Sequence, residues 1–285
     1  EEELYMQYAY GLDINSSFTG EDLFSAGLVT GNASGPLASM DSAETGDLDV
    51  TSLFYNFPVG DLSVTVGPLV DQDDVVAATT SQYSDAFRLG SMPFSLDGDL
   101  TGPGIGISYN ADNGIVASAS YLSLSGNSAG TGLGINADNG DDISTFTLGY
   151  NGEGFGGGLV IASNDGENAA TTAYDTFGGG IYYSPESMPA TLSVTYDTKD
   201  LSTGNDETDF FVGVDYDMGP GTLHAAYNSK DVDGGSADDQ TGFEVAYSYA
   251  VNDSVTIKPG YFTVEETTPG SSDDSGVVLE TTFNF

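Results

Sequence analysis

The chain of 285 residues contains no cysteine, no tryptophan and a single histidine, His224. Without cysteine there is neither a disulfide framework nor thiol chemistry, and one histidine is too few for a zinc site. Basic residues are nearly as scarce. Four of them (Arg88, Lys199, Lys230 and Lys258) stand against 44 acidic residues, and the formal net charge is −40. Such a chain repels nucleic acid and attracts cations.

Long apolar runs are also missing, since no run approaches the ~18 apolar residues that a membrane helix needs. Residues 1–3, all glutamate, are not a signal peptide, so for an exported protein we expect that the signal has been removed. Disorder is not expected either, because 11% of the residues are aromatic and recur in regular alternation.

What the chain does contain is a period of two, in which apolar and polar side chains point to opposite faces of a strand. Residues 6–18 show it, with Met6, Tyr8 and Leu12 on one face. Residues 276–285 show it again and end on the aromatic Phe285. One face of each strand is oily and one is polar, so lipid on the outside and water on the inside would satisfy both.

The connections between these strands alternate between tight turns and long polar stretches, as in outer-membrane barrels with periplasmic turns and extracellular loops. Residues 71–103 contain no convincing strand, and we expect this long loop to fold into the lumen. The sequence therefore predicts an all-β fold, a single transmembrane antiparallel β-barrel domain over residues 1–285. About sixteen strands are expected, with fourteen as the alternative and one strand hidden near the long loop or around 23–29.

Two irregularities interrupt the alternation. Leu48 and Val50 are in one phase and Leu53 and Tyr55 in the other, which predicts a β-bulge near Thr51. The strands 155–161 and 177–183 are rich in glycine and have almost no side chains on their inner face. Either another body, such as the long loop, packs there, or glycine relieves crowding at a bent wall.

Three parts of the sequence resemble cyanobacterial outer-membrane porins, a family related to carbohydrate-selective porins. Residues 17–24 and 27–32 are similar to the first hairpin of that family, where a Ser-Phe-x-Gly-x-Asp-Leu run precedes a strand ending in Gly-Asn. Residues 53–60 with 62–68, and then 104–109, resemble the elements on either side of a long loop. The resemblance implies a trimeric barrel that passes small solutes and inorganic ions. Few basic residues are present, so the family's sugar or anion preference is not carried over.

Catalytic patterns are weak. His224 lies in the polar phase of residues 222–228, which places it on the lumen wall, and there is no Gly-x-Ser-x-Gly elbow or phosphate-binding loop. A phospholipase-like barrel would need His224 beside a serine. Solvated acidic loops are the simpler interpretation of the carboxylate clusters, with weak loop-bound calcium as the alternative and no other cofactor expected. The calcium candidates are Asp138, Asp141 and Asp142.

Carboxylates along a narrow wet passage concentrate cations and oppose anions. The predicted constriction residues on the loop are Asp71, Asp73, Asp74, Asp85 and Arg88, and the predicted wall residues are Asp13, Asp197, Asp215, Glu244, Lys258 and Glu280. Arg88 and Lys258 are the candidates for a transverse field.

We therefore expect a general diffusion porin of the bacterial outer membrane that passes small hydrophilic solutes and inorganic ions and prefers cations. The expected partners are membrane lipid, small solutes, cations and two further copies of the chain, without nucleic acid. The alternative is a secreted or surface-layer β-protein that binds calcium and has no pore.

Overall fold

The computed structural model describes residues 4–87, 89, 100–138, 140–166, 172–234, 239–265 and 273–285. These residues form fifteen β-strands and two short 3₁₀ helices, η1 (Gly35–Ser39) and η2 (Asp73–Val75). The strands β1 to β15 span Ala9–Ser16, Leu23–Asn32, Thr45–Val59, Leu62–Asp71, Thr101–Asn110, Ile115–Ser123, Asp142–Asn151, Phe155–Asn164, Tyr174–Tyr183, Ala190–Leu201, Glu207–Met218, Gly221–Val232, Gln240–Asn252, Val255–Val264 and Asp274–Phe283.

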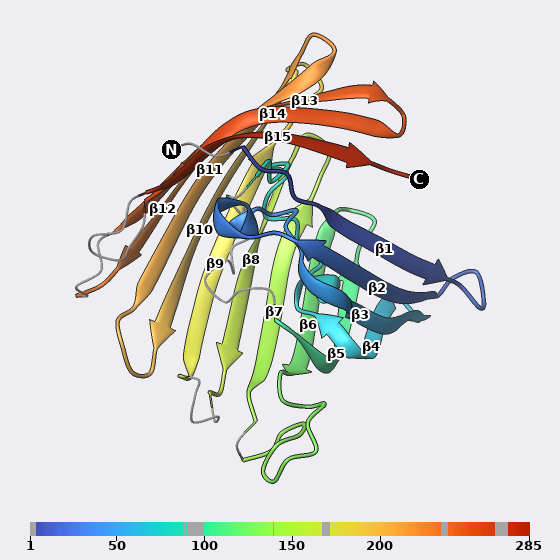
Figure 1. Cartoon of the computed structure of the whole chain (residues 1–285). Helices are drawn as coiled ribbons and strands as arrows, with labels where there is room; N and C mark the ends of the chain where they lie inside the picture. The colour runs from blue at the N-terminus through green and yellow to red at the C-terminus, as the bar shows by residue number, and fades with distance from the viewer. Residues whose placement is uncertain are drawn as a thin grey trace.

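All fifteen strands belong to one sheet, in which each strand pairs with its neighbours in the chain. Every pair is antiparallel. The sheet curls strongly, with inward-folded segments on its concave side (Figure 1). Among the described residues no backbone pairing joins the edge strands β1 and β15, which run in the same direction because the strand number is odd. They approach where the rings of Tyr10 and Phe285 stack, 6.1 Å between centroids.

The observed strands confirm the predicted all-β antiparallel class and come within one of the predicted sixteen. The segment 23–29, where a strand was thought to be hidden, is part of β2. The first strand is shorter than predicted at both ends, because Met6 and Tyr8 precede β1 and Phe18 follows it. The predicted bulge lies at Thr51, since Gly27 pairs with Ser52 and Leu28 with Val50.

Apolar side chains cover the outer face of the sheet and remain exposed. Phe146 and Leu148 on β7 are 57% and 58% exposed, and Ile181 on β9 is 65% exposed. In a β-sandwich these apolar side chains would be buried between two sheets, whereas a barrel in lipid presents them to acyl chains. In the described part of the chain, no helix has the length and apolar character required to cross a membrane.

The buried side chains lie on the inner face, where loops pack against the wall. One cluster joins Phe87 of the loop between β4 and β5 to Phe211 on β11 and Phe262 on β14. A second cluster joins Val75 of the same loop to Leu122 on β6 and Ile143 on β7. The hydrophobic core is therefore an interface between this loop and the barrel wall.

One tight turn is held by a single carboxylate. Asp22, 7% exposed, accepts hydrogen bonds from Ser17 Oγ at 2.6 Å and from Tyr55 Oη at 2.5 Å. It also accepts the backbone N–H groups of Phe18 and Thr19. The bond from Ser17, followed by that from Tyr55, holds the pKa of Asp22 well below its usual range. The ionised carboxylate thus fixes the turn between β1 and β2.

Candidate functional site: the constriction loop and the inner wall

The site is built by the constriction loop, defined here as the described residues 72–87 and 89 between β4 and β5. It turns inward at once, because the Gln72 side chain is fully buried and donates from Nε2 to Thr145 Oγ1 on β7 at 2.8 Å. Ala77 then donates its backbone N–H to Ser118 on β6 at 3.2 Å. Its carbonyl accepts a 2.9 Å bond from Asn151 Nδ2 on β7. The first part of the loop is thus fixed to the wall by hydrogen bonds of its backbone and of side-chain amide groups.

Further along, the loop binds strands on the other side of the barrel. Gln82 N–H donates to Ser193 Oγ on β10 at 2.9 Å. Tyr83 Oη donates to Glu244 Oε1 on β13 at 2.7 Å, and Leu89 N–H donates to Oε2 of the same carboxylate at 3.2 Å. The loop therefore follows the inner wall from β6 to β13 rather than projecting freely into the lumen.

Lys258 on β14 joins the loop to the last strand. Its Nζ lies 2.9 Å from Glu280 Oε1 on β15 and donates to the carbonyl oxygen of Ala86 at 2.6 Å. It also lies 5.4 Å from the centre of the Phe87 ring. The charge is paired and mostly covered, with 17% of the side chain exposed. This ammonium therefore holds the loop and has little charge left for a transverse field.

His224 is part of a chain of polar contacts across three adjacent strands. Its Nδ1 lies 2.7 Å from Asp215 Oδ1 on β11, and its Nε2 lies 2.8 Å from Ser248 Oγ on β13. Since the carboxylate accepts, Nδ1 donates to Asp215, and Nε2 shares the second hydrogen bond with the Ser248 hydroxyl. Serine, histidine and aspartate in this order also occur in hydrolases. Here the second oxygen of Asp215 is bound by loop Ser84, through its N–H at 2.9 Å and its Oγ at 2.6 Å. The arrangement therefore anchors the loop.

The glycine-rich strands lie directly beneath the loop. A methyl group added to Gly158 on β8 would lie 2.5 Å from Ala78 Cβ, and one on Gly180 on β9 would lie 2.3 Å from the carbonyl oxygen of Thr80. Of the two interpretations of these strands, the structure supports packing of another body, and that body is the loop.

The predicted constriction residues occupy different environments. Asp73 and Asp74 in η2 are exposed, and Asp74 Oδ2 accepts the backbone N–H of Asp71 at 2.9 Å. Asp71 is half-buried and accepts a 2.8 Å bond from Thr101 Oγ1. Asp85 is half-buried and has a left-handed backbone, with φ of 41°. Arg88 lies outside the described residues.

The predicted wall residues separate into two groups. Asp197, Asp215 and Glu244 are buried, at 2%, 8% and 0% exposed, rather than open to water as we had expected. For Asp215 and Glu244 the physical reason is the constriction loop, which lies over them and uses them as acceptors. Asp13 on β1 is exposed, and Glu280 is half-buried beside Lys258.

Sequence reasoning missed several residues of the site. Asp47 and Asp49 on β3 are exposed, and they face inward because Leu48 and Val50 face outward. Their alternation with two apolar residues was a usable signal. Tyr83 and Ser84 gave no signal, because an irregular loop has no period from which the direction of a side chain follows.

The candidate calcium ligands lie near the start of β7. Asp141 and Asp142 are buried, and Asp142 Oδ1 has no hydrogen-bond partner. Among the described residues, which omit Asn139, no group of three or more histidine, aspartate or glutamate side chains is arranged to hold a metal ion. Calcium binding at Asp138, Asp141 and Asp142 stays a prediction.

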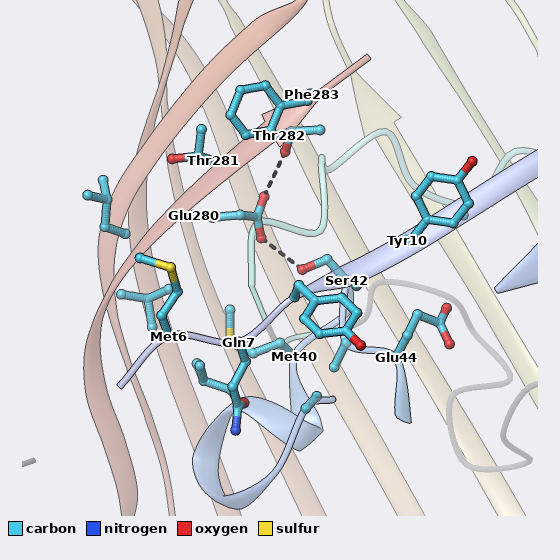
Figure 2. A pocket seen from close by; sticks show the side chains of 18 of the residues that line it. Met6, Gln7, Tyr10, Met40, Ser42, Glu44, Glu280, Thr281, Thr282 and Phe283 are labelled. Carbon is cyan, nitrogen blue, oxygen red and sulfur yellow. Dashed lines mark hydrogen bonds between the residues drawn. The ribbon is translucent and has the colours of Figure 1, made fainter. Parts of the chain in front are cut away.

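A separate cavity of about 840 Å³ lies at the seam between the N-terminal segment and β15 (Figure 2). The connection between β2 and β3 lines it from within, and there Ser42 Oγ donates to Glu280 Oε2 at 2.8 Å. Met40 of the same connection is buried in the cluster around Phe87. This connection therefore contacts both the last strand and the constriction loop, since the N–H of Asp41 also donates to the carbonyl oxygen of Phe87 at 2.6 Å.

Comparison with known proteins agrees with this geometry. The sequence model of the Gram-negative porins matches residues 62–269. No curated protein matches the chain. Solved structures are similar over nearly its whole length. OmpT, an outer membrane protein of Vibrio cholerae, has a TM-score of 0.65 at 14% identity, covering 97% of this chain and 89% of its own.

Two other porins have the same architecture. A porin refined at 1.8 Å resolution has a TM-score of 0.63 at 13% identity, over 97% of this chain and 92% of its own. An anion-selective porin from Comamonas acidovorans has a TM-score of 0.61 at 14% identity, over 96% and 85%. At such low sequence identities, the structural similarity establishes the fold alone. The family follows from the match of the sequence model to residues 62–269. The chain therefore belongs to the Gram-negative porins, and it is a diffusion channel of the outer membrane rather than an enzyme.

Proposed function

We propose that this porin passes small hydrophilic solutes and inorganic ions passively and prefers cations. The observation that carries the proposal is the charge of the uncovered inner wall. The constriction loop covers the wall from β5 to β14, whereas the inward side chains of β1 and the first half of β3 are exposed. Exposed inward carboxylates there are Asp13, Asp47 and Asp49, and the loop adds Asp73 and Asp74.

Few positive charges oppose these carboxylates. Lys258 is paired with Glu280, and Lys230 Nζ lies 2.8 Å from Glu207 Oε2. Lys199 Nζ lies 4.0 Å from the centre of the Tyr174 ring. A carboxylate 4 Å from a cation in water contributes about 1 kcal/mol, about a fivefold local enrichment, and salt screens this attraction. Several such groups around one passage support a clear preference for cations.

The fold alone does not determine the sign of the selectivity. The Comamonas acidovorans porin has the same architecture and is described as anion-selective. The side chains that line the passage must therefore decide which ions pass. In this chain the balance of 44 acidic to four basic residues favours cations.

Other properties of the channel are also proposals. The resemblance to cyanobacterial porins supports a homotrimer, and the exposed apolar face supports contact with membrane lipid. The constriction loop would act as the size filter. Loop-bound calcium at Asp138, Asp141 and Asp142 stays the alternative to solvated acidic loops. A secreted calcium-binding protein without a pore does not account for the exposed apolar outer face.

The test is a single-channel recording in a planar bilayer with a KCl gradient. We expect stepwise conductance and a reversal potential of the sign that indicates K⁺ permeation over Cl⁻. The preference should weaken as total salt rises, because surface potentials are screened. A reversal potential indicating Cl⁻ permeation would contradict the charge assignment, and absence of conductance would contradict the channel.

A further inference from the structure

The inference concerns the glycine track, defined here as the inward-facing glycines that lie beneath the constriction loop. Going around the wall from β5 to β14, these are Gly106, Gly149, Gly158, Gly180, Gly213, Gly242 and Gly260. We propose that the glycine track sets the bore of the channel, by letting the loop lie flat against the wall. This proposal rests on the proposed function and concerns the size limit of the same passage.

From Val75 to Tyr83 the contacts follow the order of the strands. Val75 lies over Gly106 on β5, Ala78 over Gly149 and Gly158 on β7 and β8, and Thr80 over Gly180 on β9. Tyr83 then lies over Gly213 on β11, and the last two contacts are Leu89 over Gly242 on β13 and Phe87 over Gly260 on β14. The described residues between Val75 and Leu89 therefore lie against glycines on seven strands.

Hydrogen bonds to intervening strands show independently that the loop is seated here. The N–H of Ala77 reaches Ser118 on β6, and the N–H of Gln82 reaches Ser193 on β10. At these positions β6 and β10 offer serine hydroxyl groups, while the track glycines on the neighbouring strands leave space for the loop. The backbone of the loop thus approaches the wall closely enough for direct bonds, which side chains larger than glycine would prevent.

Gly158 is the most informative position. A methyl group there would lie 2.5 Å from Ala78 Cβ, and a methyl group on Gly149 would lie 2.7 Å from the same atom. Ala78 has no rotatable side chain, so relief requires movement of the loop backbone. The wall blocks movement outward, and the loop must therefore shift toward the lumen. A narrower passage follows.

The chain offers a matched control. Gly11 on β1 also alternates with outward apolar residues, Tyr10 and Leu12, and a methyl group added to it would have no atom within 4 Å. Gly11→Ala and Gly158→Ala thus make the same chemical change on the inner face of the barrel. Only the second meets the loop.

The experiment compares wild type, Gly11→Ala, Gly158→Ala and the exchange Ala78→Gly/Gly158→Ala in planar bilayers and in liposome swelling with sugars of increasing size. We expect Gly158→Ala to lose single-channel conductance and to admit only smaller sugars, with the cation preference retained. Gly11→Ala should match wild type. The exchange Ala78→Gly/Gly158→Ala should have wild-type conductance, because removing the Ala78 methyl group makes room for the methyl group added to Gly158.

The outcomes separate the two proposals. A wild-type protein without conductance would contradict the proposed function itself. A conducting wild type with Gly158→Ala equal to Gly11→Ala would overturn only the role of the glycine track. If Gly158→Ala yields no folded barrel, the exchange should recover folding and conductance, and an exchange that remains defective would also overturn the inference.

Discussion

Tyr83 on the constriction loop donates a 2.7 Å hydrogen bond to Glu244 on β13, a residue 161 positions later in the chain. The carboxylate is fully buried, and its other oxygen accepts the N–H of Leu89. A buried carboxylate is tolerated only where it is well bonded. Glu244 therefore acts as an anchor of the loop, although its phase on the strand also fits a residue that lines water.

Removing this bond should loosen the loop with little effect on ion preference. A hydrogen bond to a charged group contributes about 1.5–3 kcal/mol, so in Tyr83→Phe the part of the constriction loop around residue 83 should fluctuate. We expect noisier open-channel current with an unchanged reversal potential. Tyr196→Phe is the matched control, because Tyr196 is 49% exposed on the outer face. A large change of selectivity in Tyr83→Phe would contradict the anchoring role.

The exposed carboxylates of η2 should carry selectivity. In the double variant Asp73→Asn/Asp74→Asn we expect the K⁺ to Cl⁻ permeability ratio to fall by about two- to fivefold, given about 1 kcal/mol per close charge and screening by salt. Asp61→Asn/Asp112→Asn serves as the control, because it removes the same two charges from the exposed turns between β3 and β4 and between β5 and β6. Equal effects of the two changes would mean that net charge, rather than position, decides.

Lys258 should act mainly through the loop. Lys258→Met removes the contacts to Ala86 and Glu280, and we expect unstable conductance together with a stronger preference for cations. Lys230→Met removes the same charge from a pair with Glu207 that joins two wall strands, β12 and β11. Steady current in Lys258→Met, indistinguishable from that of Lys230→Met, would refute the idea that this ammonium holds the loop.

The contacts of Asp22, the turn carboxylate, predict that the stability of the protein depends on pH. Asp22 has a lower pKa in the folded protein than in the unfolded chain, so its stabilising effect is complete above the unfolded value, about 4. That effect is lost as the pH falls further, toward the folded value. Asp22→Asn should therefore unfold at a lower temperature than wild type at pH 7, and the difference should shrink below about pH 4. Thermal melting of both proteins across pH measures this. A constant difference would argue against the ionised carboxylate.

The contacts of His224 allow a test of the phospholipase-like alternative. We expect neither wild type nor Ser248→Ala to hydrolyse activated esters or phospholipids, because Asp215 and His224 are engaged in anchoring the loop. Hydrolysis by wild type that is lost in Ser248→Ala would contradict this account.

Much of the fold was predictable, because its determinants are local. The alternation at Phe146 and Leu148 identified the outer face, and the change of phase around Thr51 located a bulge. The residue at which the first strand begins was harder to predict. Met6 and Tyr8 continue the alternation but lie before β1, because the neighbouring strand β2 ends at Asn32, whose N–H donates to the Tyr8 carbonyl oxygen at 3.1 Å.

The site was only partly predictable. The strand phase predicts Asp215 and Glu244 on the inner face, where the structure has both of them buried, because phase does not reveal what covers a side chain. The partner of Glu244 is a tyrosine in an irregular loop, and the sequence separation of 161 residues leaves no local trace. The glycines on β8 and β9 were the usable signal, since an inner face without side chains leaves space for something else.

The most direct test of the central claim uses the absence of cysteine. In Asp73→Cys, a thiol faces the proposed water-filled passage, and in Phe146→Cys it faces the proposed lipid. We predict that water-soluble methanethiosulfonates reduce the current of Asp73→Cys, with the cationic reagent reacting faster than the anionic one, and leave Phe146→Cys unchanged. Rapid modification of Phe146→Cys with no effect on Asp73→Cys, or a faster reaction with the anionic reagent, would contradict an acidic, cation-preferring lumen.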